Sequence, residues 1–264
     1  STRRLFSFLG TLMLLLGVIS CASYKRQYSK DETNWQEDTT LPEHAPNHTM
    51  YLVGDAGNSL TGNKPPVLRY LEGQLHKDSK NRSIRFLGDN IYPSGMPPKE
   101  DSINRQLAEY RIEAQLKILD NYQGRPIFIP GNHDWSGWGQ GGLEDQEKFV
   151  ESYLNKKHGV NDKDDWENYF LPDDGCSGPE VIELNDDIVV IVVDSNWWLA
   201  DLTEEPKLNT GCEARNKESF KFVFENTVRK YRNKNVVIAM HHPLYTYGPH
   251  GGGFTAKEHL FPLT

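Results

Sequence analysis

Side chains that could bind cations or transfer protons follow four separate apolar runs of the sequence, each at the point where the run ends. The runs end in "VGDAGN", "LGDNIY", "PGNHDW" and "AMHHPLY". They supply Asp55, then Asp89 and Tyr92, then Asn132, His133 and Asp134, and finally His241 and His242. Carboxylates, an amide oxygen and imidazoles, without thiolates, are ligands that suit Mn, Fe or Zn. Because two runs end in a carboxylate, the pattern indicates two ions with one carboxylate bridging them, an arrangement suited to displacement at phosphorus.

Taken singly, each motif has an ordinary structural explanation. A Gly-Asp pair after a strand, such as Gly54 and Asp55, is often only a turn or a helix cap. A pair of histidines is often only solvated. The ordered set is the stronger indication, because every member occupies the same place relative to an apolar run. Gly54, Gly88 and Gly131 precede the polar residues, and glycine lets the backbone turn sharply and approach closely.

The alternation of apolar runs with amphipathic segments predicts how these side chains are positioned. Strands are expected at 49–55, 84–89, 126–132, 186–195 and 235–242, and helices at 65–78, 100–121, 143–157 and 212–234. Strands that alternate with helices form a parallel or mixed sheet covered by helices, so the predicted fold class is α/β. In such sheets the functional groups gather beyond the carboxyl ends of the strands.

The composition limits the range of partners. The chain has 264 residues and a net charge of −8, with enough apolar and aromatic residues for the core of a soluble globular protein. The negative charge argues against a nucleic-acid partner and against a basic membrane-binding face. An acidic protein that acts on anionic substrates needs local positive charge, and metal ions are one source of it.

The first twenty-one residues differ from the rest of the chain. A basic "STRR" precedes the apolar "LFSFLGTLMLLLGVIS", which is short for a membrane span, and Cys21 follows; residues 1–21 are typical of a secretory signal. The ending "VIS-C" resembles a bacterial lipobox, in which Cys21 becomes the lipidated first residue; an uncleaved anchor or an ordinary signal peptide is the alternative. The polar residues 22–46 predict a tether. We therefore expect an exported protein, lipid-anchored to the membrane in the bacterial periplasm or at the cell surface.

Two cysteines remain once Cys21 is assigned to the lipid. Cys176 and Cys212 lie in the loop-like stretches "DDGCSG" and "NTGCEA". An exported protein meets an oxidising environment, which favours a disulfide between them. Two unpaired loop cysteines are the alternative, because the sequence does not show that their Cα atoms approach each other.

The motifs together resemble a known family. The series GDxG, GDxxY, GNHD and H-x-P, carried by "GDNIYPSG", "GNHDWSG" and "HHPLYTYGPHG", resembles the calcineurin-like metallophosphoesterases over roughly residues 49–264. The GDxxY form is similar to the purple acid phosphatases, in particular the small tartrate-resistant type. The resemblance implies a metallophosphoesterase domain over 47–264, folded as a four-layer α-β-β-α sandwich with mixed sheets flanked by helices. It also implies a dinuclear metal centre and hydrolysis of phosphate esters.

The resemblance also assigns roles by position. Asp55 and Tyr92 would hold the first ion, Asp89 would bridge, Asn132 and His241 would hold the second, and His242 and His250 would face the substrate. For the last two, solvated loop positions are an equal alternative. The family's fifth motif, GHxH, is absent, and the chain stops at "HLFPLT" about where the run leading to it would begin. We expect that the C-terminal part of the domain is missing.

The phenol of Tyr92 bears on the choice of metal. Tyrosine normally ionises near a pH of about 10, so ligation at neutral pH requires a strongly polarising cation. Tyr92 therefore favours Fe(III) as the first ion, with Fe(II), Zn or Mn as the second. A tyrosine that only packs against the wall of the pocket is the alternative.

The leading hypothesis is metal-dependent hydrolysis of phosphate monoesters, with a metal-bound hydroxide as nucleophile. His133 is the expected catalytic acid or electrostatic partner at the leaving oxygen, and Asp134 would orient it unless it only caps the following segment. The alternatives are a phosphodiesterase on the same scaffold and a non-catalytic surface binding module. The expected partners are a small phosphorylated substrate and, through the lipid anchor, the membrane, and we expect a monomer.

Overall fold

The structure is a computed structural model that describes residues 46–76, 81–200 and 211–244. All the elements below belong to one compact unit, residues 44–242. The predicted signal peptide with Cys21, the predicted tether up to residue 45, and His250 lie outside the described residues.

The first sheet is parallel, and its strands end level with one another. It consists of β1 (Thr49–Val53), β2 (Arg82–Phe86) and β3 (Ile127–Phe128), in the order β1-β2-β3. Val53 lies opposite Phe86, and Phe86 lies opposite Phe128. The residues that follow the three strands therefore emerge at the same edge of the sheet.

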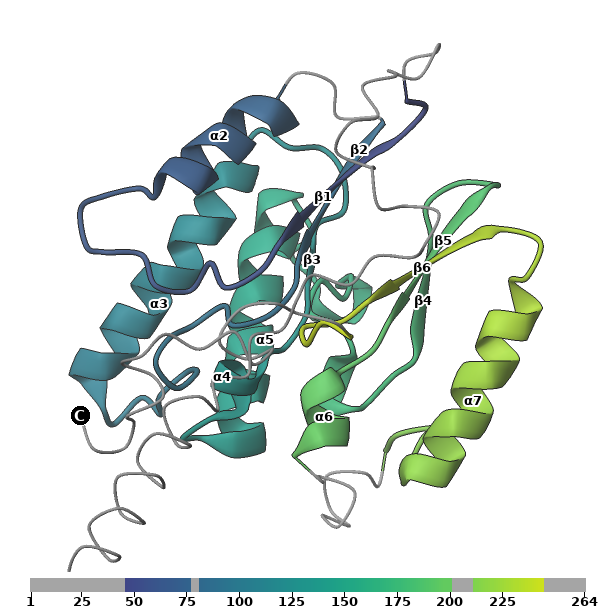
Figure 1. The fold of residues 1–264 in the computed structure, drawn as a ribbon. Helices are drawn as coiled ribbons and strands as arrows, with labels where there is room; N and C mark the ends of the chain where they lie inside the picture. The colour runs from purple at the N-terminus through teal and green to yellow at the C-terminus, as the bar shows by residue number, and fades with distance from the viewer. Residues whose placement is uncertain (1–45, 77–80, 201–210, 245–264) are drawn as a thin grey trace, which may run out of the picture. The chain divides into compact units, whose positions relative to one another are not determined.

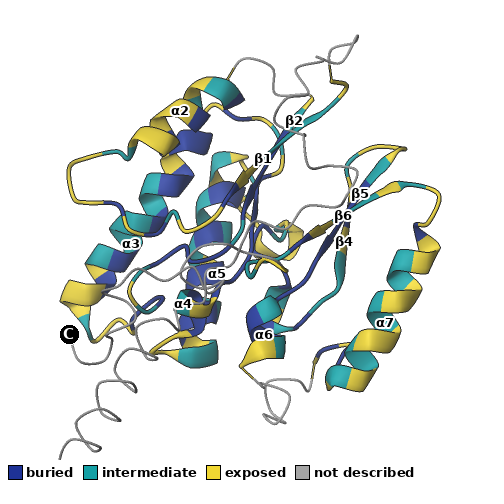
Figure 2. Cartoon of the chain, viewed as in Figure 1, coloured by how far each residue is buried: buried dark blue, intermediate teal, exposed yellow. Residues whose placement is uncertain are grey.

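Three helices cover one face of this sheet (Figure 1). They are α2 (Pro66–Leu75), α3 (Ser102–Leu116), which continues into the 3-10 turn Lys117–Leu119, and α5 (Gly139–Lys157). Apolar residues recur along α2 at Leu68, Leu71 and Leu75, and all three are buried. Such spacing places them on one side of a helix, where they pack in one hydrophobic core with Ile84 and Phe86 of the sheet. Figure 2 shows the buried stripes of the helices turned toward the strands.

The second sheet is mixed. Its order is β4 (Glu180–Glu183), β5 (Ile188–Val192), β6 (Asn235–Ala239); β4 and β5 are antiparallel, and β5 and β6 are parallel. The apolar β5 is the central strand, as its unbroken run of Val and Ile predicts for a strand covered on both faces. Sequence reasoning missed β4, because a strand of four residues with exposed Val181 and Glu183 has too short a pattern to distinguish it from a loop.

The two sheets pack face to face through a second core. This core joins Ile127 of β3 and Ile129, which follows β3, with Ile182, Val190 and Ala239 of the second sheet. α7 (Lys217–Lys230) lies on the other side of the second sheet, and α6 (Ser195–Leu199) lies beyond the end of β5 (Figure 1). Trp197 of α6 is part of the first core. The short elements are α4 (Asn132–Trp135) and the 3-10 turns Lys163–Asp165 and Asp173–Gly175. The predicted α/β class, with mixed sheets flanked by helices, is confirmed.

The two cysteines predicted to pair are joined in the structure. Cys176 and Cys212 form a disulfide with their Cα atoms 5.6 Å apart, across a sequence separation of 36 residues. The bond links the segment before β4 to the segment before α7. Among the helices of the described ranges, none has the length and apolar character needed to cross a bilayer.

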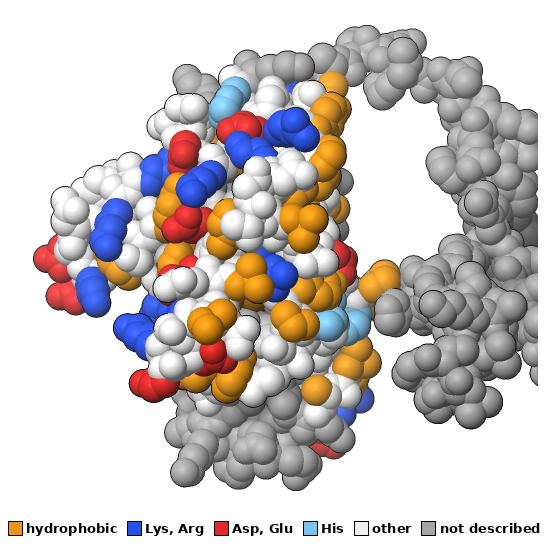
Figure 3. All heavy atoms as spheres, turned by 90° about the vertical axis from the view of Figure 1, so that its left-hand side faces the viewer, with side chains coloured by type: hydrophobic (Ala, Val, Ile, Leu, Met, Phe, Trp, Pro, Cys, Tyr) orange, Lys and Arg blue, Asp and Glu red, His pale blue; other side chains and the backbone are white. Residues whose placement is uncertain are grey.

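Figure 3 shows the side of the molecule on which α2 and α3 lie. Lysine and arginine side chains alternate there with aspartate and glutamate, and apolar groups are scattered between them. On this face, the described residues form no broad patch of a single charge sign.

Candidate metal centre

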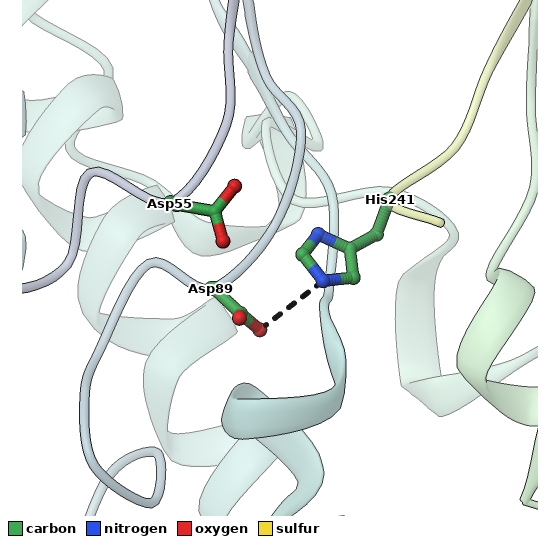
Figure 4. A group of neighbouring side chains, drawn as sticks. All are labelled: Asp55, Asp89 and His241. Carbon is green, nitrogen blue, oxygen red and sulfur yellow. Dashed lines mark ion pairs between the residues drawn. The ribbon is translucent and has the colours of Figure 1, made fainter. Parts of the chain in front are cut away.

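The four strand ends meet as the sequence predicts. Asp55 follows β1, Asp89 follows β2, Asn132 opens α4 after β3, and His241 follows β6. Ligand atoms of Asp55, Asp89 and His241 all lie within 4.8 Å of one another (Figure 4). Side chains separated by up to 186 positions in the sequence are thus brought together at one edge of the two sheets.

The backbone at both carboxylates is unusual. Asp55 has a φ of 58° and Asp89 a φ of 53°, in the left-handed region. Apart from glycine, Asp and Asn tolerate this region best, and most other residues are strained there. Aspartate at these two positions therefore both tolerates the left-handed backbone and supplies a carboxylate that can bind a cation.

Two glycines allow the loops to approach. A Cβ atom on Gly131 would collide with Asp89 Oδ1, and one on Gly88 would lie 2.7 Å from His241 Nδ1. Any side chain at either position would push the ligands apart. Gly54 is different, because a Cβ atom there would meet nothing within 4 Å. The close approach expected at all three glycines is therefore found at two of them.

Asp89 lies at the centre of the group and is almost fully buried, with 3 % of its surface exposed. Its Oδ1 accepts a hydrogen bond from the backbone N–H of His133 at 2.9 Å and lies 3.5 Å from His241 Nε2. Its Oδ2 lies 2.9 Å from the hydroxyl of Tyr92. One carboxylate therefore faces partners on both sides, which is the placement that a bridging ligand requires.

His241 presents one ring nitrogen to the site. Its Nδ1 lies 2.8 Å from the carbonyl oxygen of Leu87, which can only accept, so Nδ1 carries the proton. Nε2 then points toward Asn132 Oδ1, 3.1 Å away, and toward Asp89 Oδ1. A backbone carbonyl on the remote nitrogen is a common way to orient a histidine that binds a metal.

Tyr92 reaches both carboxylates. Its hydroxyl lies 2.8 Å from Asp55 Oδ1 as well as 2.9 Å from Asp89 Oδ2. Burial and then the hydrogen bonds to these two aspartates raise the pKa of Tyr92. Without added positive charge the side chain is therefore a phenol, and a cation among these oxygens is what would favour the phenolate.

His133 lies beside Tyr92, with the ring centroids 4.4 Å apart. Its Nδ1 lies 2.6 Å from the carbonyl oxygen of Pro93, which assigns the proton to that nitrogen. Its Nε2 lies 4.0 Å from Asp89 Oδ2, and about a third of the side chain is exposed. The imidazole is thus held at the edge of the site with one nitrogen turned toward it.

Asp134 does not make the contact with the His133 ring that sequence reasoning considered. Its carboxylate is fully buried and accepts hydrogen bonds from the backbone N–H groups of Gly131, Asn90 and Ile91 at 2.8, 3.0 and 3.1 Å. The carbonyl of Pro93, instead, orients the His133 ring. Burial raises the pKa of Asp134 to about 6, although these N–H donors favour its ionised form. Asp134 therefore acts as a cap, which was the alternative role for this residue. It also accepts hydrogen bonds from a second loop, the one that follows β2.

His242 directly follows His241 in the chain and therefore lies next to the site. Its Nδ1 lies 2.8 Å from the hydroxyl of Ser195, whose oxygen also accepts the backbone N–H of His242 at 3.0 Å. Its ring stands edge-on to that of His241. A role for His242 toward the substrate stays a prediction.

Sequence reasoning missed the polar residues behind the site. Asn90 received no chemistry, and Gln115 and Gln146 were not considered, yet all three are buried. A signal was present: both glutamines occupy apolar positions of amphipathic helices, for example Gln115 between Ile112 and Leu116. A polar residue at such a position is expected to have a buried partner.

The donor set fits a cation. Four oxygen-bearing side chains and one imidazole nitrogen converge, and the available atoms of Asp55, Asp89, Asn132 and His241 are acceptors. The Tyr92 hydroxyl has one proton and can donate it to only one of the two carboxylates at a time, so these acceptors repel one another unless a positive charge lies among them. The protein is therefore an α/β sandwich with a group of side chains at its strand ends that could hold a metal ion.

The comparison with protein families agrees with this class. The family described as calcineurin-like phosphoesterase matches residues 44–262. The chain belongs to the calcineurin-like phosphoesterases. None of the curated proteins shows a significant match. Membership and the Asp/Asp/His group together indicate a hydrolase that cleaves phosphoester bonds with metal ions, of which this family typically binds two.

Proposed function

We propose that the protein hydrolyses phosphate monoesters at a dinuclear centre of the purple acid phosphatase kind. The observation that carries the proposal is the position of Asp89 between two groups of ligands. Tyr92 and Asp55 lie on its Oδ2 side, and His241 with Asn132 lies on its Oδ1 side. Two ions sharing Asp89 would each find ligands of suitable type.

The protein's own residues then have distinct roles. Asp55 and Tyr92 would hold the first ion, and Asn132 and His241 the second. Bound ions supply charge neutralisation for the phosphoryl group and lower the pKa of water. His133, with its Nδ1 held by Pro93, would keep Nε2 directed at the leaving oxygen, where it can donate a proton.

The activity can be tested with p-nitrophenyl phosphate and the metal-loaded protein. Asp89→Asn is the sharper variant, because Asn tolerates the left-handed backbone where Ala would be strained. We expect a loss in kcat of at least about 1000-fold with an unchanged circular dichroism spectrum. Asn155→Leu, a buried position at the far end of α5, is the matched control and should retain activity. Equal rates in Asp89→Asn and parent would remove Asp89 from the site.

Iron at the first position can be tested through Tyr92. A phenolate bound to Fe(III) absorbs visible light, so the iron-loaded parent should be coloured and Tyr92→Phe colourless. The spectrum after iron reconstitution is the measurement. A colourless parent that contains oxidised iron would show that Tyr92 does not bind the iron and would leave it as a packing residue.

A phosphodiesterase is the second candidate, and one feature favours it. A pocket of about 160 Å³ lies beside Tyr92 and is lined in part by Pro93, Leu107 and Trp138. Such a pocket has room for a small apolar group, as a second ester substituent would be. The ratio of kcat/KM for bis-p-nitrophenyl phosphate to that for p-nitrophenyl phosphate distinguishes the two; a ratio above one would reverse the assignment.

Export and a lipid anchor at Cys21 stay predictions. The disulfide between Cys176 and Cys212 supports export, because such bonds persist in oxidising compartments. We propose a protein held at the membrane by its lipid, with the hydrolase domain acting on small phosphorylated compounds outside the cytoplasm.

A further inference from the structure

Four polar side chains are buried directly behind the metal-binding residues. At most 1 % of the surface of each is exposed, and they come from four separate elements of the chain. They are Asn90 of the loop after β2, Gln115 of α3, Asp134 of α4 and Gln146 of α5. None of them is among the residues that would touch an ion.

Asp134 ties the two ligand-bearing loops together. Its oxygens accept the N–H groups of Asn90 and Ile91, which directly follow Asp89, and that of Gly131, which directly precedes Asn132. Hydrogen bonds to a carboxylate are stronger than those between neutral groups. One buried side chain therefore sets the separation of the loops that carry Asp89 and Asn132.

The other three side chains strengthen the link between the two loops, two of them from the helices α3 and α5. Gln146 of α5 donates to Asp134 Oδ1 at 3.1 Å, and Gln115 of α3 donates to the backbone carbonyl of Asn90 at 2.8 Å. The Asn90 amide donates to Ile129 O at 2.9 Å and to Asp134 Oδ2 at 3.2 Å. Each loop is thus fixed to the rigid helical layer as well as to the other loop.

The network serves geometry more than stability. The side-chain oxygens of Asn90, Gln115 and Gln146 have no hydrogen-bond partner among the described residues. A buried polar atom without a partner costs free energy, and apolar side chains of similar size would avoid that cost. Asp89, however, must be held in a left-handed conformation close to Asp55 and Tyr92.

We propose that Asp134, Asn90, Gln115 and Gln146 form a positioning network that fixes Asp89 and Asn132 in the geometry needed to bind metal. The expected effect on metal binding rests on the proposed function, whereas the effect of the network on the position of the loops does not. Removing a member should loosen the loops and weaken metal binding while leaving every ligand in place.

The test compares two variants of one helix. Gln146→Leu removes a donor of the network, and Asn155→Leu removes another fully buried amide of α5, which bonds Glu151 O and Glu167 instead. We expect the dissociation constant for Mn²⁺, measured by calorimetry on metal-depleted protein, to rise about tenfold in Gln146→Leu and less than twofold in Asn155→Leu. Asp134→Asn, which turns an amide N–H toward the loop donors, should raise it by about 100-fold.

A second measurement does not need metal. The backbone N–H of His133 bonds Asp89 and contacts neither variant side chain, so its hydrogen exchange reports the position of Asp89. In metal-depleted protein its exchange should be faster by about tenfold or more in Gln146→Leu and unchanged in Asn155→Leu. If the parent binds no Mn²⁺, the proposed function fails while this exchange still decides the inference. Equal effects of the two variants, or unchanged exchange in Gln146→Leu and Asp134→Asn, would overturn it.

Discussion

Two groups of carboxylates in this protein show how differently the same residue type is used. At the metal centre, Asp55 and Asp89 lie with His241 around one point. The second group, here called the acidic cluster, comprises Glu147 and Glu151 of α5, Asp173 and Asp174 of the 3-10 turn Asp173–Gly175, and Glu180 of β4. In the described part of the chain, Asp55, Asp89 and His241 form the one group that brings three ligand atoms within 4.8 Å.

The acidic cluster is organised around backbone donors. Glu147 accepts a hydrogen bond from the backbone N–H of Asp174 at 3.2 Å, and Glu151 accepts one from the N–H of Tyr169 at 3.2 Å. Glu180 accepts one from the N–H of Asp173 at 2.8 Å. Burial, and then the neighbouring charges of Glu151, Asp174 and Asp173, raises the pKa of Glu147 to about 8. Burial raises the pKa of Glu151 to about 7. Burial thus favours the protonated form of Glu147 and Glu151, whereas the carboxylates of the metal centre are placed to hold cations.

The largest expected effect is on the affinity for Mn²⁺, which should depend on the metal centre and not on the acidic cluster. Asp55→Asn keeps the left-handed turn but removes a charged ligand, so affinity for Mn²⁺ should fall by at least about 1000-fold, roughly 4 kcal/mol. In a thermal scan, Mn²⁺ should raise the Tm of the parent and leave that of Asp55→Asn unchanged.

Glu147→Gln supplies the control for this prediction. Its Tm should rise with Mn²⁺ as much as that of the parent, because Glu147 is not a ligand of the proposed centre. A Glu147→Gln protein that no longer responds to Mn²⁺ would mean that the acidic cluster binds the metal, and the comparison would be wrong.

The next effect concerns the disulfide beside the acidic cluster. Cys176 follows the turn that carries Asp173 and Asp174, and its bond to Cys212 closes a long segment. Replacing both cysteines by serine should lower the free energy of unfolding by about 3–4 kcal/mol, mainly because the unfolded chain gains freedom. Denaturant unfolding measures the change. Mn²⁺ affinity should alter less than twofold; a larger loss would show that the bond also supports the metal centre.

The smallest effect is a dependence of stability on pH. The pKa of Glu147 in the folded protein, about 8, is above its ordinary value of 4.5, so the folded state binds its proton more tightly. The contribution to stability is complete below pH 4.5 and is lost as the pH rises through 8. Glu147→Gln, which keeps an acceptor for the Asp174 N–H, should raise the Tm by roughly 2–5 °C at pH 8.5 and change little at pH 4.5.

The difference between the Tm values of variant and parent, followed from pH 4 to 9, is the measurement. A constant difference across this range would show that folding does not raise the pKa of Glu147. The same series in Asn155→Leu, another buried polar position of α5, should give a pH-independent difference.

The sequence alone supplied the candidate ligands and their order along the chain. Asp55, Asp89 and Asn132 each follow a parallel strand of the first sheet, so their meeting at one edge was predictable without coordinates. His241 follows β6 of the second sheet, so its approach depends on how the two sheets pack. The α/β class and the central strand β5 follow from local pattern and composition in the same way. The sequence favoured a bond between Cys176 and Cys212, and the structure showed that the two residues meet.

Only the tertiary structure decided what lies around that site. The direction of the Asp134 side chain, the two partners of Tyr92 and the acidic cluster all depend on contacts between segments far apart in sequence. Sequence periodicity reports which face of an element is buried, but it does not report which partner a buried polar group meets. That choice is made when loops and helices pack, because a buried donor or acceptor must find its partner among whatever the fold brings near.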